Sequence, residues 1–314
     1  MSGLKPIVVV GSINTDLVSL TERIPLAGET VLGSDFHIYP GGKGANQAVA
    51  VARLGYPVRM IGCVGTDSFG PQSREHLRSA GVDVELVGSS HGPSGIAVIC
   101  VSSKGENSII VTPGANASVS PAVIEQHASA IRGAGAVLAQ LEIPLESIEC
   151  LAMLCDRAKV PLILDPAPAS TLPPNVFPCV SWLTPNQTEA AFYIDDRTAE
   201  AQHDLLGIVE ELLRKGAHGV VLKLGANGSA VCGQNSPFAT VPACSVKAVD
   251  ATAAGDAFNG GFAVGLMKGM TPLESARFAS VVAAISVTRA GAQPSMPQLS
   301  EVEQFIAQQD VRPK

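Results

Sequence analysis

Short apolar runs alternate with longer amphipathic stretches along most of the chain. The apolar runs are nearly continuous and rich in β-branched residues, which is typical of parallel strands covered on both faces. We expect strands at Ile7–Val10, Val58–Ile61, Ala136–Leu138, Leu162–Leu164 and Val220–Leu224. We expect helices at Gly44–Leu54, Phe69–Ala80, Leu145–Ala158, Thr188–Phe192, Ala199–Lys215 and Gly255–Lys268. This repeated order predicts an α/β fold with a mostly parallel central sheet flanked by helices.

Two segments, Leu17–Tyr39 and Gly95–Pro113, depart from this order. Both alternate polar and apolar residues, which predicts antiparallel strands with one face solvated or covered by a partner. Paired, they would form a small β-sheet over the carboxyl edge of the main sheet, where open α/β folds bind ligands. Because the chain shows no long linker, we expect a single domain over residues 1–314. The small sheet, formed by about 17–39 and 95–113, would act as its lid.

Charge, hydropathy and cysteine spacing exclude several classes of protein. The formal net charge is −7, which argues against nucleic-acid binding that depends on clustered positive charge. No apolar run approaches the about 18 residues of a membrane span, and the N-terminus lacks a signal-peptide pattern. The seven cysteines include no Cys-x-x-Cys pair, so we expect reduced thiols rather than disulfides or zinc. The predicted protein is cytoplasmic, with no nucleic-acid or membrane partner.

Small residues dominate Asp250–Gly260, which opens one of the expected helices. Small side chains allow close approach to the backbone, and the free N–H groups of a helix N-terminus can bind an anion. Asp256 would lie in the first turn, where a carboxylate beside an anion site can accept a proton from a substrate hydroxyl. A first-turn Asp also stabilises a helix through the helix dipole alone. The residues by themselves leave both interpretations open.

Three further polar segments lie at expected junctions between strands and helices. Gly41–Ala48 has three glycines around Lys43, which fits either a backbone that approaches a ligand or a flexible turn. It lacks the spacing of a Walker P-loop, and the chain has no glycine fingerprint of a dinucleotide-binding fold. Gly11–Asp16 offers an Asn and an Asp for sugar hydroxyls, or for an Asx-turn. Thr184–Glu189 could bind phosphate or hydrated Mg²⁺, or cap a helix.

Taken together, these four segments resemble the ribokinase branch of the PfkB carbohydrate kinase family. Two of them are similar to the family's two signature sequences, and a third is similar to its Asn-x-x-Glu motif. The matching segments are Gly41–Ala48, Asp250–Phe258 and Asn186–Glu189, with Asn14–Asp16 and Gly291–Ser295 favouring the ribokinase branch. The resemblance extends over nearly the whole chain, from Ile7 to about Phe305, and the combination of motifs is specific.

The resemblance implies ATP-dependent phosphorylation of the 5-hydroxyl of ribose, with Asp256 as the base and Mg²⁺ and K⁺ as cofactors. The anion hole that it implies consists of the backbone N–H groups of Ala253, Ala254, Gly255 and Asp256. The implied sugar contacts are Asn14, Asp16, Gly42, Lys43, Asn46, Glu142 and Asp256. The implied nucleotide contacts are Asn186, Glu189, Lys223, Gly225, Gly228 and Gly255. The implied potassium ligands are Asp250, Thr252, Ser286, Arg289, Gly291 and Ser295.

Two alanines depart from the family's usual second signature. Ala253 replaces the common first glycine, and its Cβ leads us to expect a negative φ at this position. Ala251 replaces the usual Thr, so a hydroxyl is lost from the loop that would hold potassium and the anion hole. A buried hydrogen bond to a neutral partner contributes about 1 kcal/mol net, so we expect a modest effect.

Other functions remain open at the level of the sequence. One is a kinase of the same family that acts on another sugar, such as deoxyribose or fructose. Another is a non-catalytic sensor of sugar or nucleotide. The presence of Gly255 and Asp256 argues against a sensor, whereas the substitution at Ala251 is compatible with one. We also expect a homodimer formed through the lid, because exposed sheet edges and large apolar patches favour association.

Overall fold

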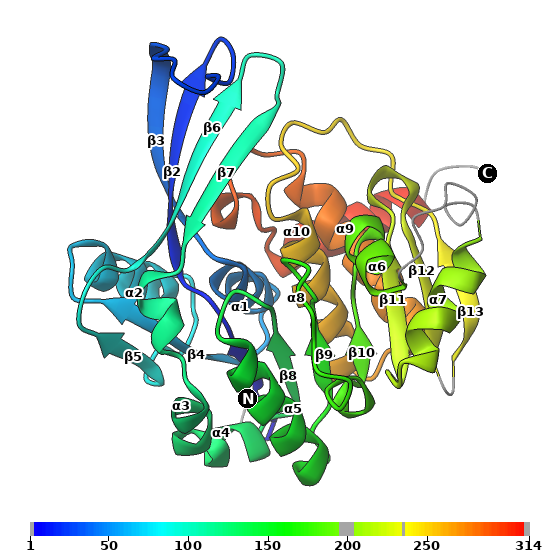
Figure 1. Cartoon of the computed structure of the whole chain (residues 1–314). Helices are drawn as coiled ribbons and strands as arrows, with labels where there is room; N and C mark the ends of the chain where they lie inside the picture. Colours follow the sequence, from blue (N-terminus) through cyan, green and yellow to red (C-terminus); the bar gives the residue numbers. More distant parts are fainter. Residues whose placement is uncertain (1–2, 195–203, 234–235, 311–314) are drawn as a thin grey trace.

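The computed structural model describes residues 3–194, 204–233 and 236–310. Within them, nine strands form the main sheet in the order β13-β12-β11-β10-β9-β8-β1-β4-β5 (Figure 1). The seven strands from β11 to β5 pair in parallel, and β12 and β13 add an antiparallel edge. Their bounds are β1 Ile7–Val10, β4 Val58–Gly65, β5 Val87–Ser90, β8 Ala136–Ala139, β9 Leu162–Leu164, β10 Trp182–Leu183, β11 Gly219–Lys223, β12 Ser229–Gly233 and β13 Ser236–Val241. The predicted mostly parallel sheet is confirmed.

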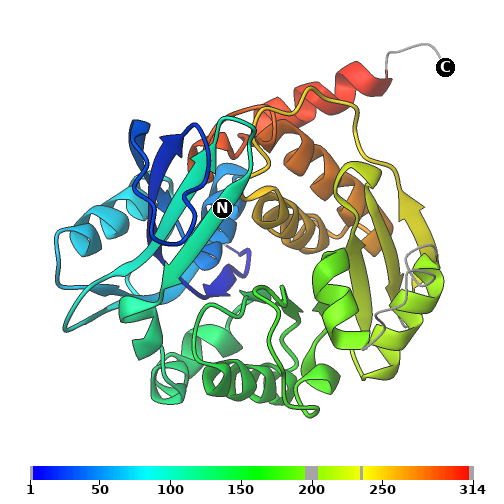
Figure 2. The ribbon, with the colours of Figure 1, turned by 45° about the horizontal axis from the view of Figure 1, so that its top comes forward.

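Helices cover both faces of this sheet (Figures 1 and 2). One face carries α1 Lys43–Arg53, α2 Phe69–Ser79, α8 Ala254–Met267, α9 Pro272–Ser286 and α10 Leu299–Asp310. The other carries α3 Pro121–Gln126, α4 Ala128–Arg132, α5 Leu145–Ala158, α6 Gln187–Ile194 and α7 Leu205–Arg214. Side chains of a strand alternate between faces, so Ile7 and Val9 pack on the first set while Val8 and Val10 pack on the second. The continuous apolar runs in the sequence thus reflect two separate cores.

The expected elements agree with the structure, with small shifts at their ends. The strands at Ile7–Val10 and Leu162–Leu164 and the helix at Leu145–Ala158 have the expected bounds. For the helix expected at Ala199–Lys215, residues 199–203 lie outside the described residues, and α7 accounts for the remainder. Among the described residues, no helix combines the length and apolar character needed to cross a membrane.

A second, smaller sheet projects beyond the carboxyl edge of the main sheet (Figure 1). Its strand order is β3-β2-β6-β7, and its bounds are β2 Asn14–Thr21, β3 Gly33–Gly41, β6 Gly95–Ser102 and β7 Asn107–Thr112. The hairpins β2–β3 and β6–β7 are antiparallel, as expected, but β2 and β6 pair in parallel. The reason is that both strands leave the same edge of the main sheet, after β1 and β5, and therefore run in the same direction.

Candidate functional site

Polar side chains gather where the parallel strands of the main sheet end. The loops after β1, β8 and β9, the start of α6 and the end of β11 all reach this edge. Together with the start of β2, they supply Asn14, Asp16, Gln140, Glu142, Asp165, Asn186 and Lys223. Helices α1 and α8, which pack against each other, add side chains from their first turns. A polar site at this edge is expected for an open α/β sheet.

Asp256 lies in the first turn of α8 and is 5% exposed. Its two carboxylate oxygens accept different donors from α1. Asn46 Nδ2 donates to Oδ2 at 2.9 Å, and Gln47 Nε2 donates to Oδ1 at 3.1 Å. Burial raises the pKa of Asp256 to about 6, while the charge of Lys43 and the two amide donors act in the opposite direction. Asp256 is thus a buried carboxylate that titrates near neutral pH, as a general base does.

Lys43, at the start of α1, is the positive charge that lowers the pKa of Asp256. Burial alone lowers the pKa of an ammonium, but four surrounding carboxylates more than compensate and raise the pKa of Lys43. These carboxylates belong to Asp256, Asp165, Glu142 and Glu189. Lys43 therefore stays charged, and it offsets part of the negative charge that converges at the site.

The remaining predicted sugar contacts adjoin this cluster. Burial and the charges of Glu142 and Asp256 raise the pKa of Asp16 to about 7. Glu142 Oε2 accepts the backbone N–H of Lys43 at 3.1 Å. The side chain of Asn14 is buried, and its Oδ1 accepts Asn116 Nδ2 at 2.7 Å. Asn14, Asp16 and Glu142 thus offer carboxylate and amide groups beside Asp256.

Gly42 joins β3 to α1 in a conformation that requires glycine. Its φ is +90°, and a Cβ at this position would lie 2.6 Å from the backbone nitrogen of Asn14. Both facts exclude a side chain. The close approach of the two backbones brings the first turn of α1 against β2, and so brings Asn46 and Lys43 toward Asn14.

A cavity of about 430 Å³ lies on the other side of the first turn of α8. Its polar end includes Lys223 and the first residues of α8, Ala254 and Gly255, whereas Phe258 and Val287 belong to its apolar wall. Lys223 Nζ faces the start of this helix, since a Cβ on Gly255 would lie 3.4 Å from it. The cavity combines an apolar wall for a planar ring with N–H groups and a cation for phosphate.

Gly225 and Gly228 form a tight turn beside this cavity and have φ values of +57° and +90°. A Cβ on Gly228 would lie 2.0 Å from the carbonyl oxygen of Val241. The turn therefore needs glycine for its own packing, independently of any ligand.

Asn186 and Glu189 interact mainly with each other. The side chain and the backbone N–H of Asn186 donate to the Glu189 carboxylate at 2.8 and 2.7 Å, and Glu189 N–H donates to Asn186 Oδ1 at 2.8 Å. This is the reciprocal arrangement of a helix cap. Burial raises the pKa of Glu189, while the positive charge of Lys223 opposes the rise. The pair caps α6 and also lies within the electrostatic reach of Lys223.

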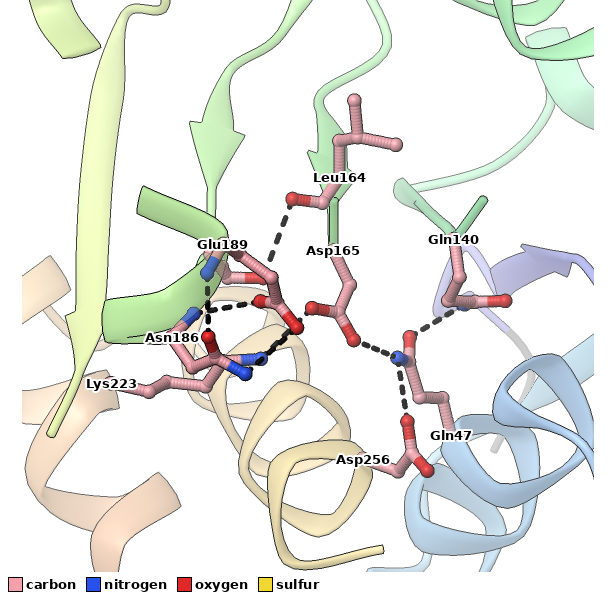
Figure 3. A network of polar contacts seen from close by, with 9 residues as sticks. Gln47, Gln140, Leu164, Asp165, Asn186, Glu189, Lys223 and Asp256 are labelled. Atoms are coloured by element: carbon pink, nitrogen blue, oxygen red, sulfur yellow. Dashed lines mark hydrogen bonds and ion pairs between the residues drawn. The ribbon is translucent and has the colours of Figure 1, made fainter. Parts of the chain in front are cut away.

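Three buried residues of the site were missed in the sequence (Figure 3). Gln47 Nε2, which donates to Asp256, also donates to Asp165 Oδ2 at 3.1 Å. Gln140 Nε2 donates to Gln47 Oε1 at 2.7 Å, and Lys223 Nζ forms an ion pair of 2.9 Å with Asp165 Oδ1. Asp165 directly follows strand β9, which is the signal that could have identified it. Gln47 and Gln140 resemble ordinary core-facing amides when the sequence is read alone.

The predicted potassium ligands lie in two loops that meet. Asp250 Oδ1 accepts the N–H of Thr252 at 2.9 Å, and Oδ2 accepts the N–H of Gly291 at 2.8 Å. These hydrogen bonds outweigh the effect of burial and lower the pKa of Asp250. The backbone N–H of Asp250 donates to the carbonyl of Val287 at 3.1 Å. The carboxylate is thus ionised and held between the loops.

Three other predicted ligands belong to the second loop. The carbonyl of Ser286 accepts the N–H of Arg289 at 3.2 Å, which closes a turn beside Val287. The Ser295 hydroxyl is fully buried and donates to the carbonyl of Ala292 at 2.7 Å. Carboxylate, hydroxyl and carbonyl oxygens are the donors that hard cations prefer. The donor set of this region fits a potassium ion.

The expectation of a negative φ at Ala253 is wrong. Ala253 precedes α8 with φ +58° and ψ +16°, the left-handed conformation that usually favours glycine. The turn is closed by a hydrogen bond of 3.2 Å from the N–H of Ala254 to the carbonyl of Ala251. The geometry of this turn outweighs the preference of alanine for a negative φ. Residue 253 therefore adopts a conformation typical of glycine, which costs about 1–2 kcal/mol in the free energy of folding.

Comparison with known proteins adds three findings. The model of the pfkB family carbohydrate kinases matches residues 4–299. The chain is 40% identical to the ribokinase of Schizosaccharomyces pombe and 38% identical to that of Haemophilus influenzae, over 95–96% of this chain and 96–98% of those proteins. The structure of Arabidopsis thaliana ribokinase complexed with ribose and ATP matches with a TM-score of 0.89 at 35% identity, covering 97% of this chain and 99% of that one.

Proposed function

Because the chain belongs to the pfkB family of carbohydrate kinases, we propose that it transfers the γ-phosphoryl group of ATP to the 5-hydroxyl of D-ribose. The products are D-ribose 5-phosphate and ADP. One observation carries the proposal above all: the buried Asp256 carboxylate lies at the N-terminus of α8, between the polar cluster around Asp16 and the cavity at Lys223. The curated relatives described above are ribokinases, which supports ribose as the acceptor.

Asp256 acts as the general base in this proposal. It orients the 5-hydroxyl toward the γ-phosphorus and takes the hydroxyl proton as the new O–P bond forms. The bond between the γ-phosphorus and the bridging oxygen breaks at the same time, and its electrons leave with ADP. Phosphoryl transfer depends chiefly on positioning and charge stabilisation. The two amide donors from Asn46 and Gln47 fix the carboxylate for that task.

Two features of the chain stabilise the charge of the transferring group. The first-turn N–H groups of α8, from Ala253 to Asp256, form the anion hole, because they have no acceptor four residues earlier within the helix. Lys223 approaches the same turn from the cavity side. The N–H of Ala254 also donates to the carbonyl of Ala251 at 3.2 Å, so this donor exchanges its partner when it binds phosphate.

Asn14, Asp16, Gly42, Lys43, Asn46 and Glu142 are proposed to bind the sugar. Their carboxylates and amides surround the space beside Asp256, and carboxylates are suited to accept hydrogen bonds from sugar hydroxyls. On the nucleotide side, Gly225 and Gly228 shape the rim of the cavity, while Lys223 and Gly255 face the phosphates. Asn186 and Glu189 lie next to Lys223 and complete this side.

Two ions are proposed to assist. Asp250 and Ser295 side chains, with the carbonyls of Thr252, Ser286, Arg289 and Gly291, would hold K⁺, which orders the anion hole without touching substrate. Mg²⁺ prefers a few carboxylates, waters and substrate phosphates; the Glu189 carboxylate is suited to hold its hydration shell. Bound Mg²⁺ neutralises charge on the phosphate oxygens.

The small sheet is proposed to serve as the lid and as the dimer contact. Residues that lie opposite each other in a sheet share a face. Asp16 pairs with Tyr39 and Ala97, which defines the sugar-facing side. The opposite side carries a row across all four strands, Ile38–Leu17–Val98–Ile110. Ile38, Val98 and Ile110 are 53%, 44% and 66% exposed, so this side of the sheet presents an apolar surface to solvent. We propose that a second copy of the chain covers it.

A coupled assay of ADP release tests the proposed reaction. The purified chain is given ATP and Mg²⁺ with ribose, deoxyribose or fructose, first in potassium and then in sodium buffer. Ribose-dependent turnover that is higher in potassium supports both the reaction and the potassium site. Turnover with only another sugar would support phosphoryl transfer but contradict ribose as the substrate. Ribose binding without turnover by any sugar would favour a sensor. The cytoplasmic location remains a prediction from the sequence.

A further inference from the structure

We propose that Gln47 is a positioning residue for phosphoryl transfer, which holds the Asp256 carboxylate at one end of a hydrogen-bonded relay that reaches Lys223 at the nucleotide cavity. The relay runs Asp256–Gln47–Asp165–Lys223 through buried side chains (Figure 3). This inference rests on the proposed kinase activity, and its experiment is chosen to separate the two.

The amide of Gln47 is fixed in a single orientation. Its oxygen accepts the side-chain amide of Gln140 at 2.7 Å, so its nitrogen must face the carboxylates. That nitrogen carries two hydrogens, and the structure provides one acceptor for each, Asp256 Oδ1 and Asp165 Oδ2, both at 3.1 Å. Gln47 is fully buried. Neither hydrogen can bind water instead, so both hydrogen bonds constrain the carboxylates.

The Gln47 amide lies between two buried carboxylates that repel each other. Asp256 and Asp165 repel each other, and each is shielded from solvent at 5% and 2% exposure. A neutral amide between them donates a hydrogen bond to each carboxylate and lowers the pKa of Asp256 without adding a charge of its own. The other charged groups that act on Asp256 are Lys43 from α1 and Asp16 from β2. Neither of these interactions depends on the side chain of Gln47.

The far end of the relay lies at the cavity proposed to bind the nucleotide. Lys223 pairs with Asp165 at 2.9 Å, is 13% exposed in its side chain, and also lines the cavity that faces the first turn of α8. A phosphate in that cavity competes with Asp165 for Lys223. When Lys223 turns to the phosphate, Asp165 retains Gln47 as a hydrogen-bond donor, so the amide remains in place against Asp256. Gln47 thereby keeps the Asp256 carboxylate positioned whether Lys223 pairs with Asp165 or with phosphate.

Gln47→Met tests this role, because Met has a similar length and volume but no amide. The expected result is a fall in kcat on the order of 10-fold to 100-fold, with little change in the KM for ribose, because Asn46 and Asp16 are untouched. The acidic limb of the kcat–pH profile should move to higher pH, since a donor that lowers the pKa of Asp256 is lost. A role in stability alone would lower the melting temperature without moving this limb.

Gln47→Glu is the second variant, in case the Met variant does not fold. It preserves the shape and adds a carboxyl group beside Asp256, so the acidic limb should again move to higher pH. Asn259→Leu is the matched control: this amide is equally buried, one turn further along α8, but it has no hydrogen-bond partner among the described residues, and the limb should keep its wild-type position. Folded Gln47 variants with an unmoved limb and wild-type kcat overturn the inference. A wild-type chain without ribose-dependent turnover overturns the proposed function instead.

Discussion

At the scale of single residues, the decisive group is the Asp256 carboxylate. Asp256→Asn keeps the size of the side chain but cannot accept the hydroxyl proton. General-base catalysis contributes about 10²–10⁴-fold, so kcat should fall by at least about 100-fold. Ribose binding, measured by calorimetry, should largely survive because Asn14, Asp16 and Lys43 remain. A variant with near-normal turnover would exclude Asp256 as the base.

The pH dependence of the reaction follows from the same cluster. Burial raises the pKa of Asp256 to about 6 and the pKa of Asp16 to about 7, so both carboxylates take up protons as the pH falls through this range. A protonated Asp256 cannot accept the hydroxyl proton, and a protonated Asp16 has lost its negative charge toward the sugar hydroxyls. We therefore expect kcat/KM for ribose to decline as the pH drops below 7, and more steeply below 6.

Initial rates at subsaturating ribose, measured from pH 5 to pH 9, test this expectation. Asp16→Asn serves as the control: it should bind ribose more weakly at every pH while its kcat keeps an acidic limb. A kcat/KM for the wild-type chain that stays constant from pH 7 to pH 5 would contradict the assignment of both groups.

At the scale of an element, the first turn of α8 combines the helix dipole with the proposed anion hole and the proposed base. Ala253 keeps this turn in a left-handed conformation at φ +58°. Ala253→Val should destabilise the fold by about 1–3 kcal/mol, because a β-branched residue fits this region poorly. It should also lower kcat, since the N–H groups of the anion hole begin at this residue.

Ala253→Gly is the matched control for that element. Glycine relieves the strain but gains freedom in the unfolded chain, so the free energy of unfolding should stay within about 1 kcal/mol of the wild type. Thermal unfolding and ADP release are measured on both variants. If Val is tolerated as well as Gly, then the left-handed turn is not a constraint on the protein.

At the scale of the whole molecule, the small sheet has two apolar faces with different neighbours. The outer face, which includes Ile110, is proposed to meet a second copy. The inner face, which includes Ile109, is the face that carries Asp16 and is proposed to face the sugar. We expect a dimer at micromolar concentration by light scattering, and Ile110→Lys should shift it toward monomer. Ile109→Lys should leave the mass unchanged while it alters sugar binding. A wild-type chain that is monomeric at this concentration would contradict the proposed contact.

The sequence by itself determined the architecture and the location of the chemistry. Runs such as Ile7–Val10 must alternate between two cores, which specifies a parallel sheet between helix layers. Parallel strands place their carboxyl ends together, so Asn14 and Asp16 could be assigned to the edge where open α/β sheets bind ligands. The resemblance of the motifs around Lys43 and Asp256 to the pfkB family then implied a carbohydrate kinase. The architecture and the position of the motifs depend on hydrophobic periodicity and on local sequence, and both can be read from a single sequence.

Only the tertiary structure decided how the polar groups pair. Gln47 and Asp165 are 118 residues apart, and no local pattern indicates that one amide bridges two carboxylates. The pKa of Asp16 depends on burial and on Glu142, which lies far away in the sequence. The parallel pairing of β2 with β6 also depends on contacts between distant segments. Hydrogen bonding, burial and charge coupling act through space, and so they appear only when the folded chain brings their partners together.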